Sequence, residues 1–357
     1  MMNGTFAIGL WERAIAFFAL ALCLSACAPV GFEMQPESAK IVDPNCIVSI
    51  GEDCGEPPPP PVPVNETITT QTTNKIDILI VIDNSGSMDV ERAALGNRLK
   101  NFLDPLAGLD WQLCVTTSDV GDQNGQPIKF PNGSRVLTPA TVNAEQQFLD
   151  AVVNVADGTG DEEPVRAQVR AFTNPDSNCY RADAALVSVS LTDEDERSTG
   201  GYFQFRDHRQ FKELVADNLG EAVVAAVQSK WGRQKVFTAH AIVIKSGDQA
   251  CYNIQAAQNN NAYHGTRLEH LAALTDGKVG NICAADYAAQ MTSIGDHVKT
   301  TTSALTLACA PLSPPQVILP PAYSSTQVTN SGDKLYFNPV LPAGVNVTVN
   351  YTCPGKR

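Results

Sequence analysis

Apolar runs and amphipathic segments alternate along the middle of the chain. Residues 76–82 form a β-branched, almost uninterrupted apolar run, which is typical of a strand buried on both faces of a parallel sheet. Further strands are predicted at residues 111–117, 184–191 and 236–244. Helices are predicted around them, at residues 90–103, 142–155, 211–228, 268–274 and 285–298. This alternation predicts an α/β fold with a doubly wound, mainly parallel sheet, in which ligands bind beyond the carboxyl ends of the strands.

The pattern changes after residue 302, where prolines cluster and helical periodicity disappears. Short strand-like runs follow at residues 303–308, 334–337 and 345–351. In the last run, alternate apolar residues would share one face of a strand: Val345, Val347, Val349 and Tyr351. We therefore expect a small antiparallel β-module at residues 303–357, after an α/β domain at residues 75–302.

The N-terminal residues indicate export. An apolar stretch at residues 14–22 is too short to span a membrane and is followed by small residues, so residues 1–26 are predicted to be a signal peptide. The Leu-Ser-Ala-Cys sequence that ends at Cys27 resembles a bacterial lipobox, which implies a lipid on Cys27 and a place in the cell envelope. Ala28 in the next position resembles the signal for an outer-membrane destination. The alternatives are a plain signal peptide cut elsewhere, or a buried helix.

Residues 27–74 are polar and rich in proline. The consecutive prolines at residues 57–61 favour stiff polyproline II, so this segment is predicted to be a tether that holds the domain away from a membrane. No apolar run of the sequence has the length of a spanning helix, so membrane contact is expected through the lipid anchor only.

The chain has 10 cysteines. Cys23 lies in the predicted signal peptide and Cys27 would carry the lipid, which leaves an even number in an exported chain and favours disulfides. Sequence order alone establishes no connectivity. Our hypothesis pairs neighbours along the chain: Cys46 with Cys54, Cys114 with Cys179, Cys251 with Cys283, and Cys309 with Cys353. A zinc site is disfavoured, because no pair has the Cys-x-x-Cys spacing.

Charge and motifs argue against two classes of function. With 38 Asp and Glu against 25 Lys and Arg, the net charge is −13, so nucleic-acid binding is not expected. The sequence has no Gly-x-Ser-x-Gly elbow, no His-Glu-x-x-His and no Gly-Lys-Ser/Thr phosphate loop. Its 5 histidines are scattered. We therefore expect no catalytic residues and do not expect an enzyme.

Candidate chemistry lies where the first predicted strand ends. The strand runs directly into Asp83-Asn84-Ser85-Gly86-Ser87. A carboxylate and two hydroxyls spaced by two residues can converge from one tight loop, and hard oxygen ligands suit Mg²⁺. The alternative is that Asp83 and the serines only cap the following helix.

This Asp-x-Ser-x-Ser loop between a buried strand and a helix resembles the metal-ion-dependent adhesion site (MIDAS) of the von Willebrand factor A (VWA) family. The resemblance covers roughly residues 75–300 and implies a Rossmann-like fold. It also implies two further site residues, Thr159 in a Gly-rich loop and Asp193 just after the strand at 184–191. Because a glutamate stands where the family has glycine after this aspartate, Asp195 is the alternative to Asp193.

The resemblance implies roles for these residues. Ser85, Ser87 and Thr159 would bind Mg²⁺, or else Mn²⁺ or Ca²⁺, through their hydroxyls. Asp83 and Asp193 would act largely through water and hold those hydroxyls in place. An acidic side chain of a protein ligand would complete the coordination. The predicted function is that of a lipoprotein of the bacterial envelope, at the outer membrane and facing the periplasm or the surface, that binds a protein ligand in adhesion or envelope assembly. The alternative is a metal-independent periplasmic scaffold or assembly factor.

Overall fold

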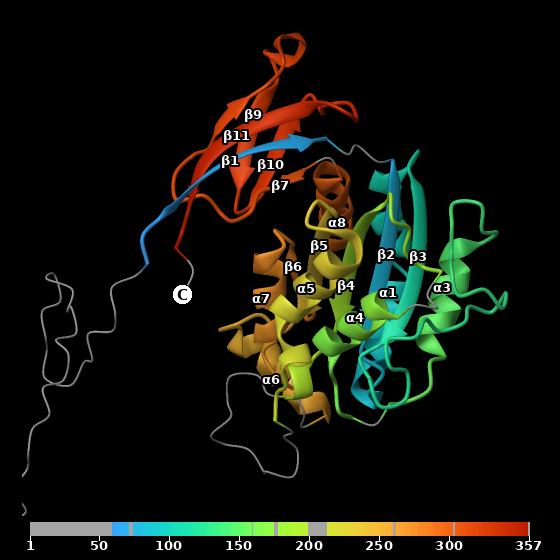
Figure 1. The fold of residues 1–357 in the computed structure, drawn as a ribbon. Helices are drawn as coiled ribbons and strands as arrows, with labels where there is room; N and C mark the ends of the chain where they lie inside the picture. The colour runs from blue at the N-terminus through green and yellow to red at the C-terminus, as the bar shows by residue number, and fades with distance from the viewer. Residues whose placement is uncertain are drawn as a thin grey trace, which may run out of the picture. The chain divides into compact units, whose positions relative to one another are not determined.

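The computed structural model describes residues 59–70, 74–158, 160–174, 178–198, 213–259, 262–302 and 304–355 (Figure 1). Its largest sheet has five parallel strands in the order β3, β2, β4, β5, β6. These strands are β2 (Lys75–Ile82), β3 (Asp110–Thr117), β4 (Ala185–Leu191), β5 (Phe237–Val243) and β6 (Val279–Asn281). The predicted α/β architecture is confirmed, and it is compatible with a Rossmann-like fold.

Helices cover both faces of this sheet. One buried apolar cluster includes residues of α1 (Asp89–Gly96), α2 (Leu99–Leu103), α3 (Ala144–Val153), α6 (Gln249–Asn259) and α8 (Ala288–Thr301). A second cluster includes residues of α4 (Pro164–Thr173), α5 (Gly220–Trp231) and α7 (Thr266–Leu274). Strand β2 contributes to both, because its successive side chains point to opposite faces: Ile78 and Ile80 belong to the first cluster, whereas Leu79 and Val81 belong to the second.

Short 3₁₀ turns connect several of these elements. They are η1 (Gly86–Met88), η2 (Asp104–Leu106), η3 (Glu196–Ser198), η5 (Ala216–Asn218) and, nearer the C-terminus, η6 (Pro321–Tyr323). The first of them lies in the loop that the sequence analysis singled out.

Two helices differ from the sequence expectation. The helix expected at residues 90–103 is divided into α1 and α2, because Gly96, a weak helix former, ends the first part. The helix expected at residues 211–228 begins only at Gly220 within the described residues. Asn218 explains this difference, because its buried side chain accepts a hydrogen bond from the Val215 amide and holds the preceding segment in a 3₁₀ turn.

The remaining strands form two small antiparallel sheets. In one, β11 (Asn346–Cys353) pairs with β1 (Val62–Thr69) and β8 (Gln316–Ile318). In the other, β10 (Lys334–Asn338) pairs with β7 (Leu305–Thr306) and β9 (Gln327–Ser331). The expected antiparallel β-module is therefore present, and the alternate apolar residues of β11 are buried as predicted.

The boundary of this module differs from the expectation. Strand β1 comes from the segment that we expected to be part of the tether, and it pairs with β11 along its whole length. Ile68 contributes to the module's apolar core, while Thr67 bonds across to Thr348 at 3.0 Å. This strand was not predicted, because the proline-rich composition of the segment is typical of a tether. Pro63 is nevertheless compatible with it, because an edge strand can hold proline without losing a ladder hydrogen bond.

Three of the four expected disulfides are present: Cys114–Cys179, Cys251–Cys283 and Cys309–Cys353. The fourth hypothesis, Cys46–Cys54, lies outside the described residues, as do the predicted signal peptide and Cys27. The hypothesis of neighbour pairing is confirmed for these three pairs.

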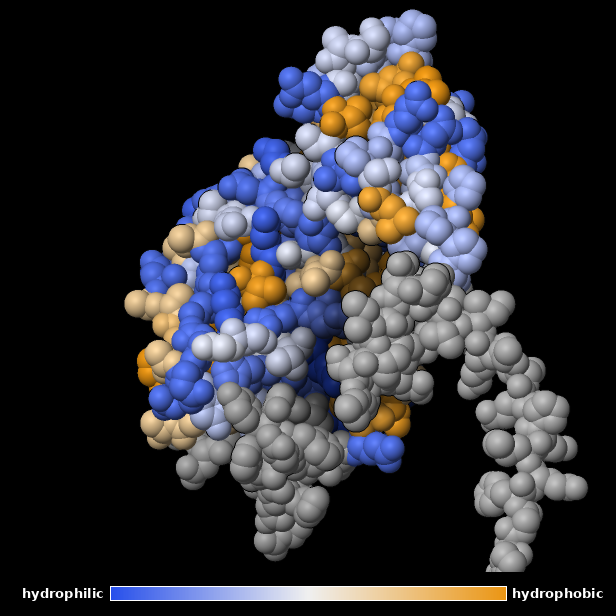
Figure 2. Space-filling view, turned by 90° about the vertical axis from the view of Figure 1, so that its left-hand side faces the viewer, coloured by the Kyte–Doolittle hydropathy of each residue, from blue (hydrophilic) through white to orange (hydrophobic). Residues whose placement is uncertain are grey.

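The described part of the chain contains no helix that is both long and apolar enough to cross a membrane. On the face that Figure 2 shows, most of the coloured surface is hydrophilic, and hydrophobic residues occur in small groups. Large exposed apolar side chains include Val90, Val142 and Ile254, which belong to different parts of the chain. Scattered apolar residues of this kind are normal on the surface of a folded protein.

Candidate functional site

The candidate site lies at the carboxyl ends of two neighbouring strands. The loop Asp83–Ser87 follows β2, and Asp193 follows β4. These strands pair in parallel, and the Asp83 amide donates to the carbonyl of Leu191 at 2.9 Å, so the two loops leave the sheet at the same edge. The residues predicted to bind a ligand therefore lie beyond the carboxyl ends of the strands, where ligands bind in folds of this class.

Four of the five predicted site residues come together. The hydroxyls of Ser85 and Ser87 lie 2.7 Å apart, and Ser87 Oγ donates to Asp193 Oδ1 at 3.4 Å. Asp83 Oδ1 accepts the Ser85 amide at 2.8 Å, and its Oδ2 accepts Thr192 Oγ1 at 2.7 Å. Two side-chain hydroxyls and two carboxylates from separate loops therefore form one polar cluster.

The fifth predicted residue, Thr159, lies outside the described residues. The loop that carries it is nevertheless attached to the cluster, because the Gly158 amide donates to the Asn84 carbonyl at 3.0 Å. Asn84 Nδ2 also donates to the carbonyl of Ala156 at 2.9 Å. A side chain at Gly158 would collide with the Asn84 amide, where a Cβ would come within 2.8 Å of it. The glycine allows this close approach.

The interpretation of Asp83 and the serines as simple helix caps is not supported. No side-chain cap hydrogen bond is present at the N-terminus of η1 or of α1. Instead, Asp83 bonds to an amide within its own loop and to Thr192, and the serines bond to each other. These groups organise the loop rather than terminate the helix.

Burial raises the pKa values of the two carboxylates in this cluster. Asp83 and Asp193 are both fully buried. Desolvation, followed by the negative charges of Asp83, Glu194 and Glu91, raises the pKa of Asp193 well above its usual range. Burial also raises the pKa of Asp83, against the opposing effect of its hydrogen bonds to Ser85 and Thr192. Each carboxylate would become easier to ionise beside a cation.

One oxygen of this cluster has no hydrogen-bond partner in the part of the chain that the structure describes. Asp193 Oδ2 is buried and accepts no hydrogen bond from the described residues. A buried carboxylate oxygen without a donor is costly, and a bound cation or an ordered water would remove that cost. The described residues contain no group of three or more His, Cys, Asp or Glu side chains arranged to hold a metal ion. A cation here would therefore depend on hydroxyl ligands, which the serines supply.

The acidic segment after β4 is not a solvated loop. Residues 193–196 are all buried. Asp195, the alternative to Asp193, accepts hydrogen bonds from Thr266 Oγ1 and from the Arg267 amide at the start of α7. Glu196 accepts from the Val165 amide at 2.7 Å, at the start of α4. Asp193 bonds to the serine loop, whereas Asp195 bonds to the start of α7.

Arg92 is a further contributor that the sequence analysis missed. This α1 residue is 1% exposed, and its Nη1 donates to the carbonyl oxygens of Asp83 at 3.3 Å and Ser85 at 2.9 Å. Its other terminal nitrogen pairs with Asp89. The guanidinium therefore holds the backbone of the Asp-x-Ser-x-Ser loop from the helix side. The sequence does show an arginine three positions after Asp89. This spacing is equally typical of an ion pair on the exposed surface of a helix, so it did not indicate a buried role.

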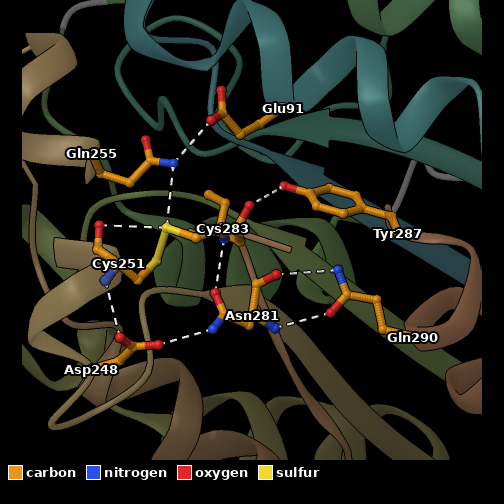
Figure 3. Close-up of a disulfide and its surroundings, with 9 residues drawn as sticks. Glu91, Asp248, Cys251, Gln255, Asn281, Cys283, Tyr287 and Gln290 are labelled. Atoms are coloured by element: carbon orange, nitrogen blue, oxygen red, sulfur yellow. Dashed lines mark hydrogen bonds between the residues drawn. A yellow bond between two sulfur atoms is a disulfide. The ribbon is translucent and has the colours of Figure 1, made fainter. Parts of the chain in front are cut away.

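The Cys251–Cys283 disulfide lies next to the same helix. Figure 3 shows Gln255 of α6 between the disulfide and Glu91 of α1, to which its Nε2 donates at 3.0 Å. Tyr287, just before α8, donates to the Ile282 carbonyl at 2.7 Å. The disulfide connects α6 with the segment before α8, and the Gln255–Glu91 hydrogen bond connects α6 with α1, the helix that follows the serine loop.

No protein-family model matches this chain, and no curated protein matches it. Among solved structures, similar ones include the pilus adhesin SpaC from Lactobacillus rhamnosus GG, with 13% identity, a TM-score of 0.37, and coverage of 81% of this chain and 41% of the adhesin. Another is proximal thread matrix protein 1 from the mussel byssus, with 10% identity, a TM-score of 0.38, and coverage of 68% and 52%. A second structure of the mussel protein has 12% identity, a TM-score of 0.35, and coverage of 67% and 48%.

This chain spans about half the length of those proteins, or less. Their TM-scores are all below 0.5, so the likenesses carry no information about the function of this chain. What the chain does has to be inferred from the geometry at the edge of its sheet.

Proposed function

We propose that this chain is a lipid-anchored protein of a bacterial envelope whose α/β domain, similar to the VWA family, binds Mg²⁺ and through it a protein ligand. The observation that carries the proposal is the convergence of Ser85, Ser87 and Asp193 from two loops at one edge of the sheet, with Asp193 Oδ2 buried and without a hydrogen-bond partner among the described residues. Hydroxyl and carboxylate oxygens of this kind suit a hard divalent cation.

In this proposal, some of the site residues bind the ion and the others hold those ligands in place. Ser85, Ser87 and Thr159 would supply hydroxyl ligands, and Asp83 and Asp193 would act through water and fix those hydroxyls. With so few direct anionic ligands, a bound cation would attract an acidic side chain of the ligand protein. Mn²⁺ or Ca²⁺ could take the place of Mg²⁺. The proposal includes no catalytic step.

The cellular setting is proposed from the sequence and from the disulfides. The lipobox-like ending at Cys27 and the proline-rich residues that follow it suggest a tether from a membrane, most simply the outer membrane. The three disulfides agree with an oxidising, extracytoplasmic compartment. Adhesion and envelope assembly would use the same site chemistry. Protease added to intact cells separates them in part, because only a surface-exposed protein would be cut.

The direct test is thermal melting of the purified protein in EDTA, Mg²⁺ and Mn²⁺. A cation that binds only the native state raises stability by about 2.7 kcal/mol at a hundredfold excess over its Kd. We expect this shift in the wild type and not in Ser87→Ala. Ser229→Ala removes an exposed serine hydroxyl from α5 and should melt like the wild type. No shift with either ion in the wild type would count against the metal site.

Asp193→Asn is a sharper test, because it should stabilise the protein in EDTA but abolish the stabilisation by Mg²⁺. Replacing the buried carboxylate by a neutral amide should raise the stability in EDTA, since burial raises the pKa of Asp193 and makes its ionisation in the folded chain unfavourable. The same change should remove the response to Mg²⁺. Asp296→Asn, on the exposed side of α8, is the matched control and should change neither quantity. Loss of stability in EDTA would mean that Asp193 has a structural role instead.

A metal-independent periplasmic scaffold is the second candidate function. The observation in its favour is that Arg92 and the hydrogen bonds of Asp83 already hold the loop without an ion. Partner binding that persists in EDTA and in Ser87→Ala would support the scaffold. Partner binding that both treatments abolish would support the metal-dependent function.

A further inference from the structure

A cavity of about 450 Å³ opens beside the serine loop. Asn84, the residue between Asp83 and Ser85, forms part of its wall, and Asp157 lines it from the loop that leads to Thr159. The end of β3 contributes Thr117, and α3 contributes Asp150. The cavity therefore shares its wall with both loops of the candidate metal site.

The charge of the lining is strongly unbalanced. Asp122, Asp150 and Asp157 place three carboxylates around the cavity, and Lys129 is the only basic residue among the described residues that line it. Asp150 accepts a hydrogen bond from Gln146 Nε2 at 2.7 Å, which neutralises no charge. A cationic group of a ligand would meet a complementary potential here.

The rest of the lining suits an aliphatic chain. Ile128, Pro131, Ala151 and Val155 contribute apolar surface between the carboxylates. Lysine and arginine side chains combine these two properties, because they bury a hydrocarbon stem and keep a charged head group at its end. A metal ion or a simple ammonium ion would leave this apolar surface uncovered.

Two buried polar atoms point to the same conclusion. Asn84 Oδ1 and Thr117 Oγ1 have no hydrogen-bond partner among the described residues, and these side chains are 5% and 2% exposed. Both residues line the cavity. Both atoms can accept a hydrogen bond, and because neither is exposed to solvent, an N–H donor of a ligand would reach them only when these two side chains turn toward the cavity.

We propose that this cavity takes a lysine or arginine side chain of the protein ligand whose acidic side chain meets the metal. The recognised surface would then present an acidic and a basic residue close together, since Asn84 belongs to the metal loop and to the cavity wall at once. This inference deepens the proposed function and rests on it. Its own evidence is nevertheless separate, because the cavity and its charges do not depend on an ion.

The test uses N-acetyl-argininamide as the probe and its neutral citrulline analogue as the matched compound. Binding to the full chain in detergent is followed by NMR of methyl-labelled alanine and isoleucine, so that Ala151 and Ile128 report from inside the cavity. We expect the argininamide to shift both signals, in EDTA as well as in Mg²⁺. The citrulline analogue should bind more weakly by about fivefold or more.

Charge variants of the lining give opposite expectations. The double change Asp150→Asn and Asp157→Asn should weaken binding by roughly fivefold to thirtyfold, because it removes two of the three carboxylates. Lys129→Gln should tighten binding instead. Asp296→Asn, which lies on α8, should leave binding unchanged. All four positions are at the surface or partly buried, so folding is not expected to interfere.

Three results would overturn the cavity proposal: no shift at Ala151 and Ile128, equal binding of the citrulline analogue, or equal effects of Asp296→Asn and the double variant. Failure of the proposed function is recognised separately, by the absence of a Mg²⁺ effect on melting. A chain that binds argininamide but not Mg²⁺ would keep the cation subsite and lose the metal site.

Discussion

Arg92 shows how much of this site depends on one side chain that no ligand would touch. Its guanidinium is buried and donates to two carbonyl groups of the serine loop, so it holds the backbone of that loop from the helix side. A buried charge with several partners is costly to disturb, because removing it leaves its partners unsatisfied. The pairing of this arginine with Asp89 connects the loop to the first turn of α1.

Arg92→Met tests this role. The aliphatic side chain fills similar space but leaves the carbonyls of Asp83 and Ser85 without their donor, so we expect a loss of about 2–4 kcal/mol in the free energy of unfolding. Urea denaturation measures the loss, and titration with Mn²⁺ measures the accompanying fall in metal affinity. Arg98→Met is the matched control, because Arg98 forms an exposed pair with Asp286 that should contribute less than about 1 kcal/mol. Equal losses in both variants would contradict the positioning role.

At the level of elements, helices and strands could be predicted where burial produces a regular pattern of apolar residues. Strand β2 is apolar on both faces and was found from its sequence alone. Strand β6 has only three residues, and helix α6 exposes Ile254 while it buries Gln255, so neither carries a recognisable pattern. The same reasoning applies to the site. The serine loop is local in sequence, whereas the approach of Asp193 required the pairing of β2 with β4.

Strand β1 is the clearest case of an element hidden by composition. The sequence around it is polar and proline-rich, and only Ile68 is buried, since the strand lies at the edge of its sheet. Its register is set by its antiparallel partner β11, from Val62 opposite Cys353 to Thr69 opposite Asn346. No local pattern could have indicated a partner that is almost 300 residues away along the chain.

Ile68→Ala tests whether β1 belongs to the folded module. Truncating a buried isoleucine typically costs about 2–5 kcal/mol, and an edge strand should lie at the lower end of that range. Val62→Ala, in the same strand but 50% exposed, should cost less than about 0.5 kcal/mol. Urea denaturation of the two variants gives the comparison. If both substitutions were neutral, residues 62–69 would be part of the tether after all.

At the scale of the whole molecule, the pH dependence of stability combines buried groups with opposite effects. Burial, together with His297 and Lys278, lowers the pKa of His240 to about 3. The unfolded chain takes up a proton at this residue near its usual pKa of about 6.5, but the folded chain does not. His240 therefore lowers stability as the pH falls from about 6.5 towards 3. Burial raises the pKa of Glu196, so this acid has the opposite sign.

His240→Gln separates the effect of the histidine on stability from that of Glu196. His240 Nδ1 accepts the Lys278 amide at 2.9 Å, and a glutamine oxygen could accept the same proton. Between pH 7 and pH 4.5 the variant should lose less stability than the wild type, by about 1–3 kcal/mol. His270→Gln is the control, because His270 lies at the surface beside Glu221. Parallel stability curves for wild type and His240→Gln, measured by urea denaturation at each pH, would contradict this assignment.

The anchor is the part of the proposed molecule that sequence alone supports, and Cys27 tests it. If Cys27 carries lipid, Cys27→Ala should move the protein from the membrane fraction to the soluble periplasmic fraction, since acyl chains contribute about 0.8 kcal/mol for each buried CH₂ group. Cys23→Ala changes a neighbouring cysteine in the predicted signal peptide and should leave the protein in the membrane fraction. Cell fractionation followed by immunoblotting gives the distribution, and mass spectrometry of the N-terminal peptide shows whether Cys27 is acylated. Cys27→Ala protein that stays in the membrane fraction, together with an unmodified cysteine in the wild type, would leave the site and the fold intact but would remove the tether from the proposal.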